Sequence, residues 1–149
     1  MARYPLRPRF RGLAWGSMGL GGALTALSFW APPVVLVSGV TGLVLGAGYL
    51  LSPTWRLAVV TSDEGLTVEG PRGPRLSLRW DEIKNVIASP TTKTCFVDGG
   101  AADRRLMVPG DGAPAPYWIE RRDALYDEVL TRVAKDRIET VPLISDRMG

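Results

Sequence analysis

The most prominent pattern along the chain is a run of 44 residues, 12–55, that contains no charged side chain. A helix that crosses the hydrocarbon core of a bilayer needs about 20 apolar residues, so this run is too long for one crossing and suits two. Pro32 and Pro33 divide it, because Pro32 disfavours helix at the residue before it and Pro33 suits the first position of a new helix. We therefore predict two antiparallel transmembrane helices, over residues 12–30 and 34–51.

The arginines around this run predict its orientation. Four of them precede it, none lies in the turn, and Arg56 follows it. Basic residues flanking membrane helices stay on the cytoplasmic side, so both termini are expected in the cytoplasm. A cleaved signal peptide is the rival interpretation, but the end of the first apolar stretch shows no small-x-small cleavage site.

Small residues recur at intervals of four in both predicted helices. In the first helix they are Gly12 with Gly16 and Ser17 with Gly21, and in the second they are Ser38, Gly42 and Gly46. This spacing lets helix backbones approach closely in a membrane. Two interpretations stay open: packing within the hairpin, and packing against a second copy or a larger membrane protein.

From residue 56 the hydrophobic pattern changes to a period of two, which is typical of β-strands. Short strands are predicted over residues 56–61, 66–69, 75–80, 93–98 and 104–108, with the segment 83–89 left undecided. Gly65 is expected to take a positive φ in the tight connection between the first two strands. Trp80, Ile83 and Val86 are expected on the buried side.

A Pro- and Gly-rich linker, residues 109–116, separates these strands from a predicted helix over residues 117–138. The helix is amphipathic, with Leu125, Val129 and Val133 on its apolar stripe. Pro142 is expected to stop it, and residues 139–149 are expected to form a flexible tail.

These features together resemble the bacterial pleckstrin-homology-like domains, which often follow a pair of membrane helices. The resemblance covers residues 56–138 and rests on a strand ending in TSDEGL, a polar hairpin, a strand closing in LRWDEI, further short strands and one C-terminal helix. It implies an α+β membrane protein with an antiparallel barrel of about seven strands capped by the helix. The organisation expected is a basic tail (1–11), a membrane hairpin (12–52), the pleckstrin-like domain and the C-terminal tail, at the bacterial inner membrane.

Charge and composition narrow the function classes. The formal net charge of the 149 residues is +3, but four arginines lie in the first 11 residues, and the soluble part is nearly neutral. Nucleic acid is therefore not an expected partner, because binding to phosphate backbones needs a basic surface. The chain has no histidine and one cysteine, so no metal, cofactor or histidine-dependent catalysis is expected.

Arginines are the candidate contacts with membrane lipids or a partner: Arg3, Arg7, Arg9, Arg11, Arg72, Arg75 and Arg79. Lipid-binding relatives of the resembled class carry bases in the first hairpin, whereas this chain has SDEG there. The last three arginines are also interpreted as strand-face side chains paired with Glu69 or Glu82. The adjacent Asp81 and Glu82 are not expected to be catalytic, and Cys95 is expected to be a buried apolar residue.

The sequence thus predicts a membrane-anchored, non-enzymatic interaction module that acts as a scaffold or subunit of a membrane assembly. Its expected partners are membrane lipids and another membrane protein or further copies of itself. The apolar residues 141–144 are a candidate segment for docking on a neighbour. A sensor of anionic lipids and an accessory subunit of a membrane enzyme or transporter are the alternatives.

Overall fold

A computed structural model describes residues 1–144 and divides the chain into two compact units. One, the helical hairpin, is Pro8–Trp55, and the other, the globular unit, consists of Met1–Arg7 and the chain from Arg56 onward. Each unit is described by itself.

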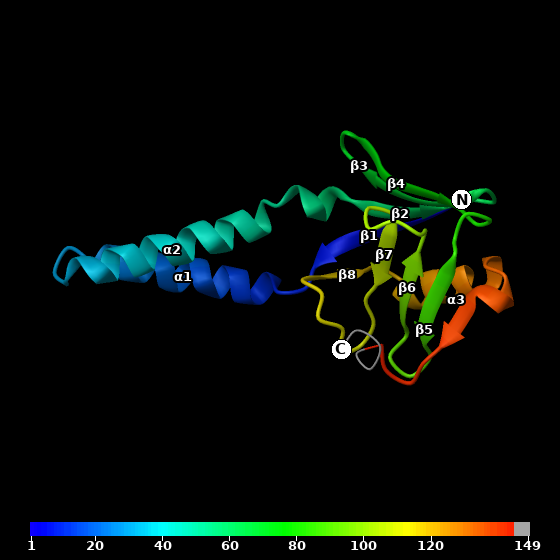
Figure 1. Cartoon of the computed structure of the whole chain (residues 1–149). Coiled ribbons are helices and arrows are strands. Elements are labelled where there is room, and N and C mark those ends of the chain that lie inside the picture. The colour runs from blue at the N-terminus through cyan, green and yellow to red at the C-terminus, as the bar shows by residue number, and fades with distance from the viewer. Residues whose placement is uncertain (145–149) are drawn as a thin grey trace. The chain divides into compact units, whose positions relative to one another are not determined.

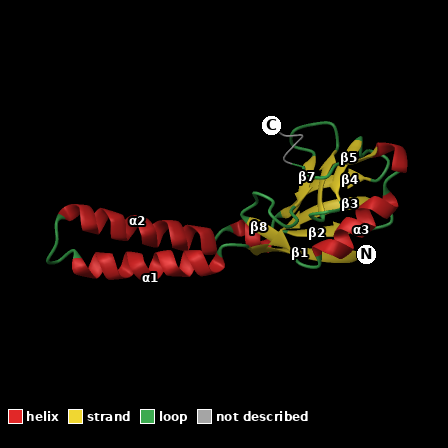
Figure 2. Cartoon of the chain, turned by 90° about the horizontal axis from the view of Figure 1, so that it is seen from below, coloured by secondary structure: helices red, strands yellow, loops and turns green. Residues whose placement is uncertain are grey.

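The globular unit has an α+β fold built on two sheets (Figures 1 and 2). Its strands are β1 (Ala2–Pro8), β2 (Ala58–Thr61), β3 (Gly65–Gly70), β4 (Gly73–Arg79), β5 (Asn85–Ser89), β6 (Thr94–Asp98), β7 (Arg105–Val108), β8 (Tyr117–Ile119) and β9 (Ile138–Thr140), and its helix is α3 (Arg122–Arg132). Short 3₁₀ helices are Pro53–Arg56 and Lys135–Arg137. The strand orders are β4-β3-β2-β1-β8 and β7-β6-β5-β9. The described strands thus form two separate sheets, and the prediction of one closed barrel is wrong.

The core of this unit is formed by both sheets together with α3. Ile83 and Val86 are fully buried, as predicted, and so are Leu125 and Val129 of α3. Trp80 is only half-buried, because β4 ends at Arg79 and the indole lies at the margin of the core. The prediction that Trp80 lies on the buried side is therefore only partly right.

The N-terminal residues form a strand, which corrects the prediction of a basic tail. Strand β1 pairs antiparallel with β2, in a register that runs from Ala2 opposite Thr61 to Pro5 opposite Ala58. On its other side β1 neighbours β8. The reason is that side chains alternate between the two faces of a strand. In ARYPLRP this alternation places Tyr4 and Leu6 in the core. The first strand thus occupies an inner position in the five-stranded sheet.

The helical hairpin is therefore an insertion between two neighbouring strands. It contains α1 (Arg11–Leu27) and α2 (Pro33–Leu50), and Pro33 stands at the start of α2 as predicted. The helices pack closely along glycines: a Cβ added to Gly21 would lie 2.6 Å from the carbonyl oxygen of Gly39. The hydroxyl of Ser17 also donates a hydrogen bond to the Gly42 carbonyl (3.0 Å).

The predicted helix over residues 117–138 is right in its middle and wrong at both ends. The α-helix is limited to Arg122–Arg132, because Arg121 has a left-handed backbone (φ 54°) and Val133 is extended (ψ 142°). The two ends of the predicted segment are strands instead. β8 joins the five-stranded sheet, and β9 pairs in parallel with β5, with Ile138 opposite Val86.

Residues 139–144 continue along the globular unit and do not form a loose tail. The Val141 N–H donates to the Ala88 carbonyl (2.9 Å), and the Ser89 hydroxyl donates to the Pro142 carbonyl (2.7 Å). Ile144 is buried. The candidate docking segment 141–144 is therefore already packed on its own chain, and the rest of the expected tail, 145–149, lies outside the described residues.

Gly65, where the connection from β2 enters β3, is needed because a neighbouring strand lies close to it, and its φ is not positive. In the described chain the glycines with positive φ are Gly73, Gly100 and Gly112, so the expectation for Gly65 is wrong. A Cβ on Gly65 would overlap the carbonyl oxygen of Leu78, so this position requires glycine because β4 lies against it.

Strand β1 and the hairpin are expected to differ in their importance for the globular fold. Deleting residues 1–7 removes the buried Tyr4 and Leu6, each worth about 2–5 kcal/mol, from a fold whose total stability is about 5–15 kcal/mol. This variant is expected to be unfolded by circular dichroism and urea titration. Replacing residues 8–55 by a short loop containing Asn-Gly should leave a folded, water-soluble unit, because β1 and β2 are antiparallel neighbours. The opposite pattern would contradict the strand order.

Candidate functional site

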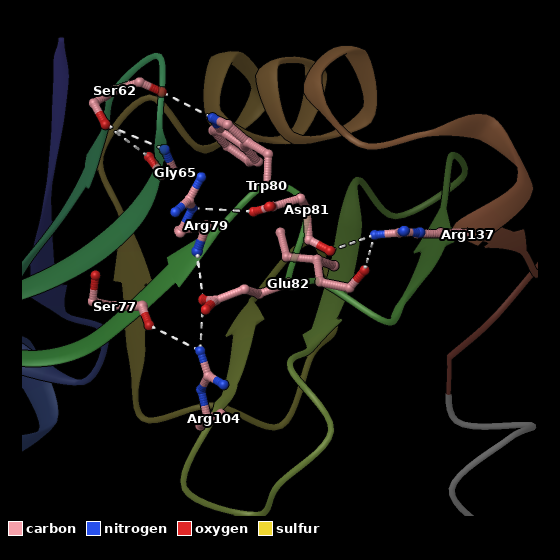
Figure 3. Close-up of polar contacts among 10 residues, drawn as sticks. Ser62, Gly65, Ser77, Arg79, Trp80, Asp81, Glu82, Arg104 and Arg137 are labelled. Carbon is pink, nitrogen blue, oxygen red and sulfur yellow. Dashed lines mark hydrogen bonds and ion pairs between the residues drawn. The ribbon is translucent and has the colours of Figure 1, made fainter.

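A group of charged side chains lies at the connection between β4 and β5 (Figure 3). This connection, residues 80–84, leads from the five-stranded sheet to the four-stranded one. Trp80 fixes its first residue to the β2–β3 connection, because the indole Nε1 donates to the Ser62 carbonyl (2.9 Å) and the main-chain N–H to the Glu64 carbonyl (3.1 Å). The start of the connection between β4 and β5 is therefore held against the connection between β2 and β3.

Glu82 is the best-connected carboxylate of this group. Its Oε2 accepts hydrogen bonds from the main-chain N–H of Arg79 (3.1 Å) and from Nη2 of Arg104 (2.8 Å). The bond from the Arg79 backbone, followed by that from Arg104, holds the pKa of Glu82 below its usual value. A carboxylate held in this way stays ionised and is poorly suited to general acid catalysis.

Arg137 holds the connection from the other side. Its Nη1 donates to the carbonyls of Asp81 (2.8 Å) and Ile83 (2.9 Å), and so joins the segment before β9 to the turn after β4 (Figure 3). The Asp81 carboxylate pairs with Arg79 Nε at 3.3 Å. Three arginines, Arg79, Arg104 and Arg137, and the carboxylates of Asp81 and Glu82 thus act together as a polar clamp on residues 80–84.

An open hollow of about 510 Å³ lies over this clamp. It is lined by Asp81, Glu82, Ile83, Lys84, Gly99, Arg104 and Arg137. Both carboxylates of the lining are in ion pairs, and the guanidinium of Arg137 is bound to main-chain oxygens. The arrangement explains how the two sheets are joined and provides no acid–base pair for catalysis.

The arginines proposed as lipid or partner contacts separate into two groups in the globular unit. Arg3 and Arg7 lie on β1 and pair with Glu69 (3.5 Å) and Glu120 (3.1 Å). Arg72 and Arg75 are exposed at and after the β3–β4 turn. The ion pairs predicted for the strand arginines are therefore wrong in detail. Glu69 pairs with Arg3 and Glu82 pairs with Arg104. Arg79 pairs with Asp81.

Cys95 lies in β6 and is fully buried. Burial raises the pKa of its thiol to about 12, so the thiol stays protonated at neutral pH. This agrees with its interpretation as a small apolar core residue.

A polar group that the sequence did not reveal joins β1, β2 and α3. The hydroxyls of Tyr4 and Thr61 both donate to Oε2 of Glu128, each at 2.8 Å. Burial, followed by the bond to Glu128, raises the pKa of Tyr4. Tyr4 and Glu128 are 124 residues apart, so no local signal could have paired them.

Four of the predicted packing residues lie at the contact between α1 and α2: Ser17, Gly21, Gly42 and Gly46. Ser38 is exposed, and its place is taken by Gly39. The reason is that steps of four residues drift by about 40° around a helix, whereas 39, 42 and 46 stay on one face. On α1, a Cβ at Gly12 or Gly16 would meet none of the described atoms within 4 Å.

The hairpin carries most of the exposed apolar surface of the chain. Of the large apolar side chains that are exposed among the described residues, only Met1, Trp118 and Leu143 lie outside it. Aromatic side chains gather at both of its ends: Tyr49 stacks edge-on with Trp55 (5.0 Å between ring centroids), and Phe29 lies beside Trp30 (6.2 Å).

A groove of about 370 Å³ lies on this hairpin, near the start of α1 and the end of α2. It is lined by Phe10, Leu13, Ala14, Ser17, Leu45, Gly46 and Tyr49. The main-chain N–H of Phe10 donates to the Tyr49 hydroxyl at 2.9 Å and links the two helices beside the groove.

One helical segment of the described chain, Pro33–Arg56, is long and apolar enough to cross a membrane by length and composition. Within residues 1–144 no group of three or more Cys, Asp or Glu side chains is placed to hold a metal ion. Comparisons with protein-family models, curated proteins and solved structures found no match to this chain.

The clamp around Glu82 predicts a pH-dependent contribution to stability. Because the pKa of Glu82 is lowered in the folded state, the contribution is present above its ordinary value of 4.5 and is lost as the pH falls through the lower, folded value. Glu82→Gln should therefore be less stable than wild type at pH 7 and equal to it at strongly acidic pH. Urea unfolding of the full chain in detergent at a series of pH values measures this.

Asp103→Asn is the matched control, because Asp103 is exposed in the turn before Arg104 and its carboxylate takes no part in the hydrogen bonds and ion pairs of the clamp. It should unfold at the same urea concentration as wild type at pH 7. A Glu82→Gln variant that is as stable as wild type at pH 7 would contradict the role of the clamp.

Proposed function

We propose that this protein is a membrane-anchored, non-enzymatic interaction module, in which the helical hairpin spans the bilayer and the globular unit serves as a cytoplasmic scaffold. The observation that carries the proposal is the position of a helical hairpin, uncharged over residues 12–55, between the paired strands β1 and β2. The wider resemblance to bacterial pleckstrin-homology-like domains stays a prediction, and the proposal does not depend on it.

The pairing of β1 with β2 supports two crossings over one. The strands flank the hairpin in sequence and lie side by side in one sheet, so they must be on the same side of any membrane. A single crossing by α2 would separate them and break the sheet. An even number of crossings satisfies the sheet, and the arginines before α1 favour the cytoplasmic side.

The surface of the hairpin supports a lipid environment. Leu13, Leu20 and Leu45 are 74%, 64% and 66% exposed, and such a surface is costly in water. At 17 and 18 residues the helices are about 26 Å long, close to the hydrocarbon thickness of a bilayer. The aromatic groups at both ends suit the two membrane interfaces.

The chemistry of the globular unit supports a scaffold over an enzyme. The sequence has no histidine, the Cys95 thiol is buried and protonated, and the carboxylates of the clamp are ion-paired. The outer face of α1 supports association: Gly12 and Gly16 form a smooth surface on which another membrane helix can lie. A second copy and a different membrane protein, including an enzyme or transporter, are both compatible with such a surface.

The first test concerns topology. Reporters fused before Met1 and after Gly149 are both expected to behave as cytoplasmic, because β1 ties the N-terminus to the rest of the sheet. A reporter inserted after Ala31, in the turn between the helices, should behave as periplasmic. Periplasmic activity of either terminal fusion would overturn the orientation, and recovery of the chain from the aqueous fraction without detergent would overturn the anchor.

The second test concerns association through the outer face of α1. Gly16→Leu should weaken a complex captured from native membranes about tenfold, since close helix contacts in membranes contribute about 1–2 kcal/mol. Gly48→Leu is the matched control, because a Cβ there also meets none of the described atoms within 4 Å but lies on α2. Equal effects of the two substitutions, or none, would argue against this face.

A further inference from the structure

We infer that the groove at the base of the helical hairpin is a binding site for one anionic phospholipid. The inference rests on the proposed membrane anchor and goes further, because it names a particular lipid class and a particular site. Neither the close packing of the two helices nor the exposed apolar surface as a whole would select one lipid over another.

The floor of the groove is formed at a close contact between the two helices. A Cβ on Gly46 would lie 2.8 Å from the Ala14 carbonyl oxygen, so the backbones almost touch there. Leu13 and Leu45 stand beside this floor and are largely exposed. Small residues between two large ones leave an open apolar channel, which is a suitable surface for an acyl chain in a bilayer.

The mouth of the groove is rigid and aromatic. Phe10 and Tyr49 are joined by the hydrogen bond from the Phe10 N–H to the Tyr49 hydroxyl. Trp55 holds Tyr49 in place, because it stacks on the phenol ring and its Nε1 donates to the Tyr49 carbonyl. The mouth is therefore fixed before a ligand arrives, which lowers the entropic cost of binding.

The sequence supplies two arginines beside Phe10 at the mouth. Arg9 and Arg11 flank Phe10 in the sequence, and the Arg9 guanidinium lies 5.6 Å from the centre of the Phe10 ring. No acidic residue occurs before Asp63, so residues 8–55 contain no carboxylate of their own. A positive mouth above an apolar channel complements a lipid with an anionic headgroup.

The volume and openness of the groove favour a membrane lipid over a water-soluble ligand. About 370 Å³ is within the range of about 300–1,000 Å³ of small-molecule sites. The groove is not enclosed, so a molecule bound there from water would leave much of its apolar surface wet. In a bilayer the neighbouring lipids cover that surface.

The test is native mass spectrometry of the full-length protein, delipidated in detergent and titrated with phosphatidylglycerol or phosphatidylcholine of identical chains. We expect one phosphatidylglycerol to bind about tenfold more tightly than phosphatidylcholine, because each arginine near an anionic headgroup adds a severalfold preference. Arg9→Gln with Arg11→Gln should remove this preference. Arg72→Gln with Arg75→Gln, an equal loss of charge elsewhere, should keep it.

The apolar part has its own matched pair. Leu13→Ser with Leu45→Ser should weaken the binding of both lipids severalfold. Leu20→Ser with Val44→Ser should not, although these side chains are equally exposed, at 64% and 63%. Equal binding of the two lipids by wild type would overturn the inference. So would an equal loss of binding in the variant of Leu13 and Leu45 and in the control variant of Leu20 and Val44. A chain that stays in the membrane fraction without this selectivity refutes the lipid site alone, whereas a chain found in the aqueous fraction refutes the anchor.

Discussion

The rest of the structure depends on the pairing of β1 with β2 across an insertion of about fifty residues. Both strands lie inside the five-stranded sheet, and Tyr4 of β1 contributes to its core. Closing so long a loop costs only a little more free energy than closing a moderate one, because the entropic cost grows with the logarithm of its length. The hairpin also forms its own contacts, so the loop is not a flexible chain. A long insertion at this position is therefore compatible with a stable sheet.

This connection also determines how the first arginines are used. Arg3 and Arg7 point to one face of β1 and are paired with glutamates from β3 and from the residue after β8. Exposed pairs of this kind add little stability, but they engage charges that the sequence suggested for lipid contact. Arg9 and Arg11 belong to the hairpin unit, on which we propose the lipid site. The end of β1 thus divides the basic N-terminus between the two units.

The sequence predicted the parts of the fold that have strong local patterns. The division at Pro32 and Pro33, the strands β2, β3, β4, β6 and β7 and the buried Ile83 and Val86 follow from periodicity and turn residues, whereas these signals leave the segment of β5 undecided. It failed for β1, β8 and β9, because these strands are stabilised mainly by partners far away in the chain. Ile119 and Ile138 lie within the predicted helix 117–138, although each belongs to a strand. The clamp was missed for the same reason: Arg104 and Arg137 reach the turn after β4 from distances of 22 and more than 50 residues.

The two units satisfy their polar groups in different ways, and this difference limits where a ligand can be recognised. In the globular unit the charged groups of the clamp are neutralised internally by ion pairs and carbonyl oxygens. In the hairpin the sequence supplies positive charge at one end and no carboxylate at all. An anion at the clamp competes with the side chains that are already paired there, whereas residues 8–55 supply no competing carboxylate. The hairpin end is therefore the more favourable place for an anionic headgroup, although the clamp holds more arginines.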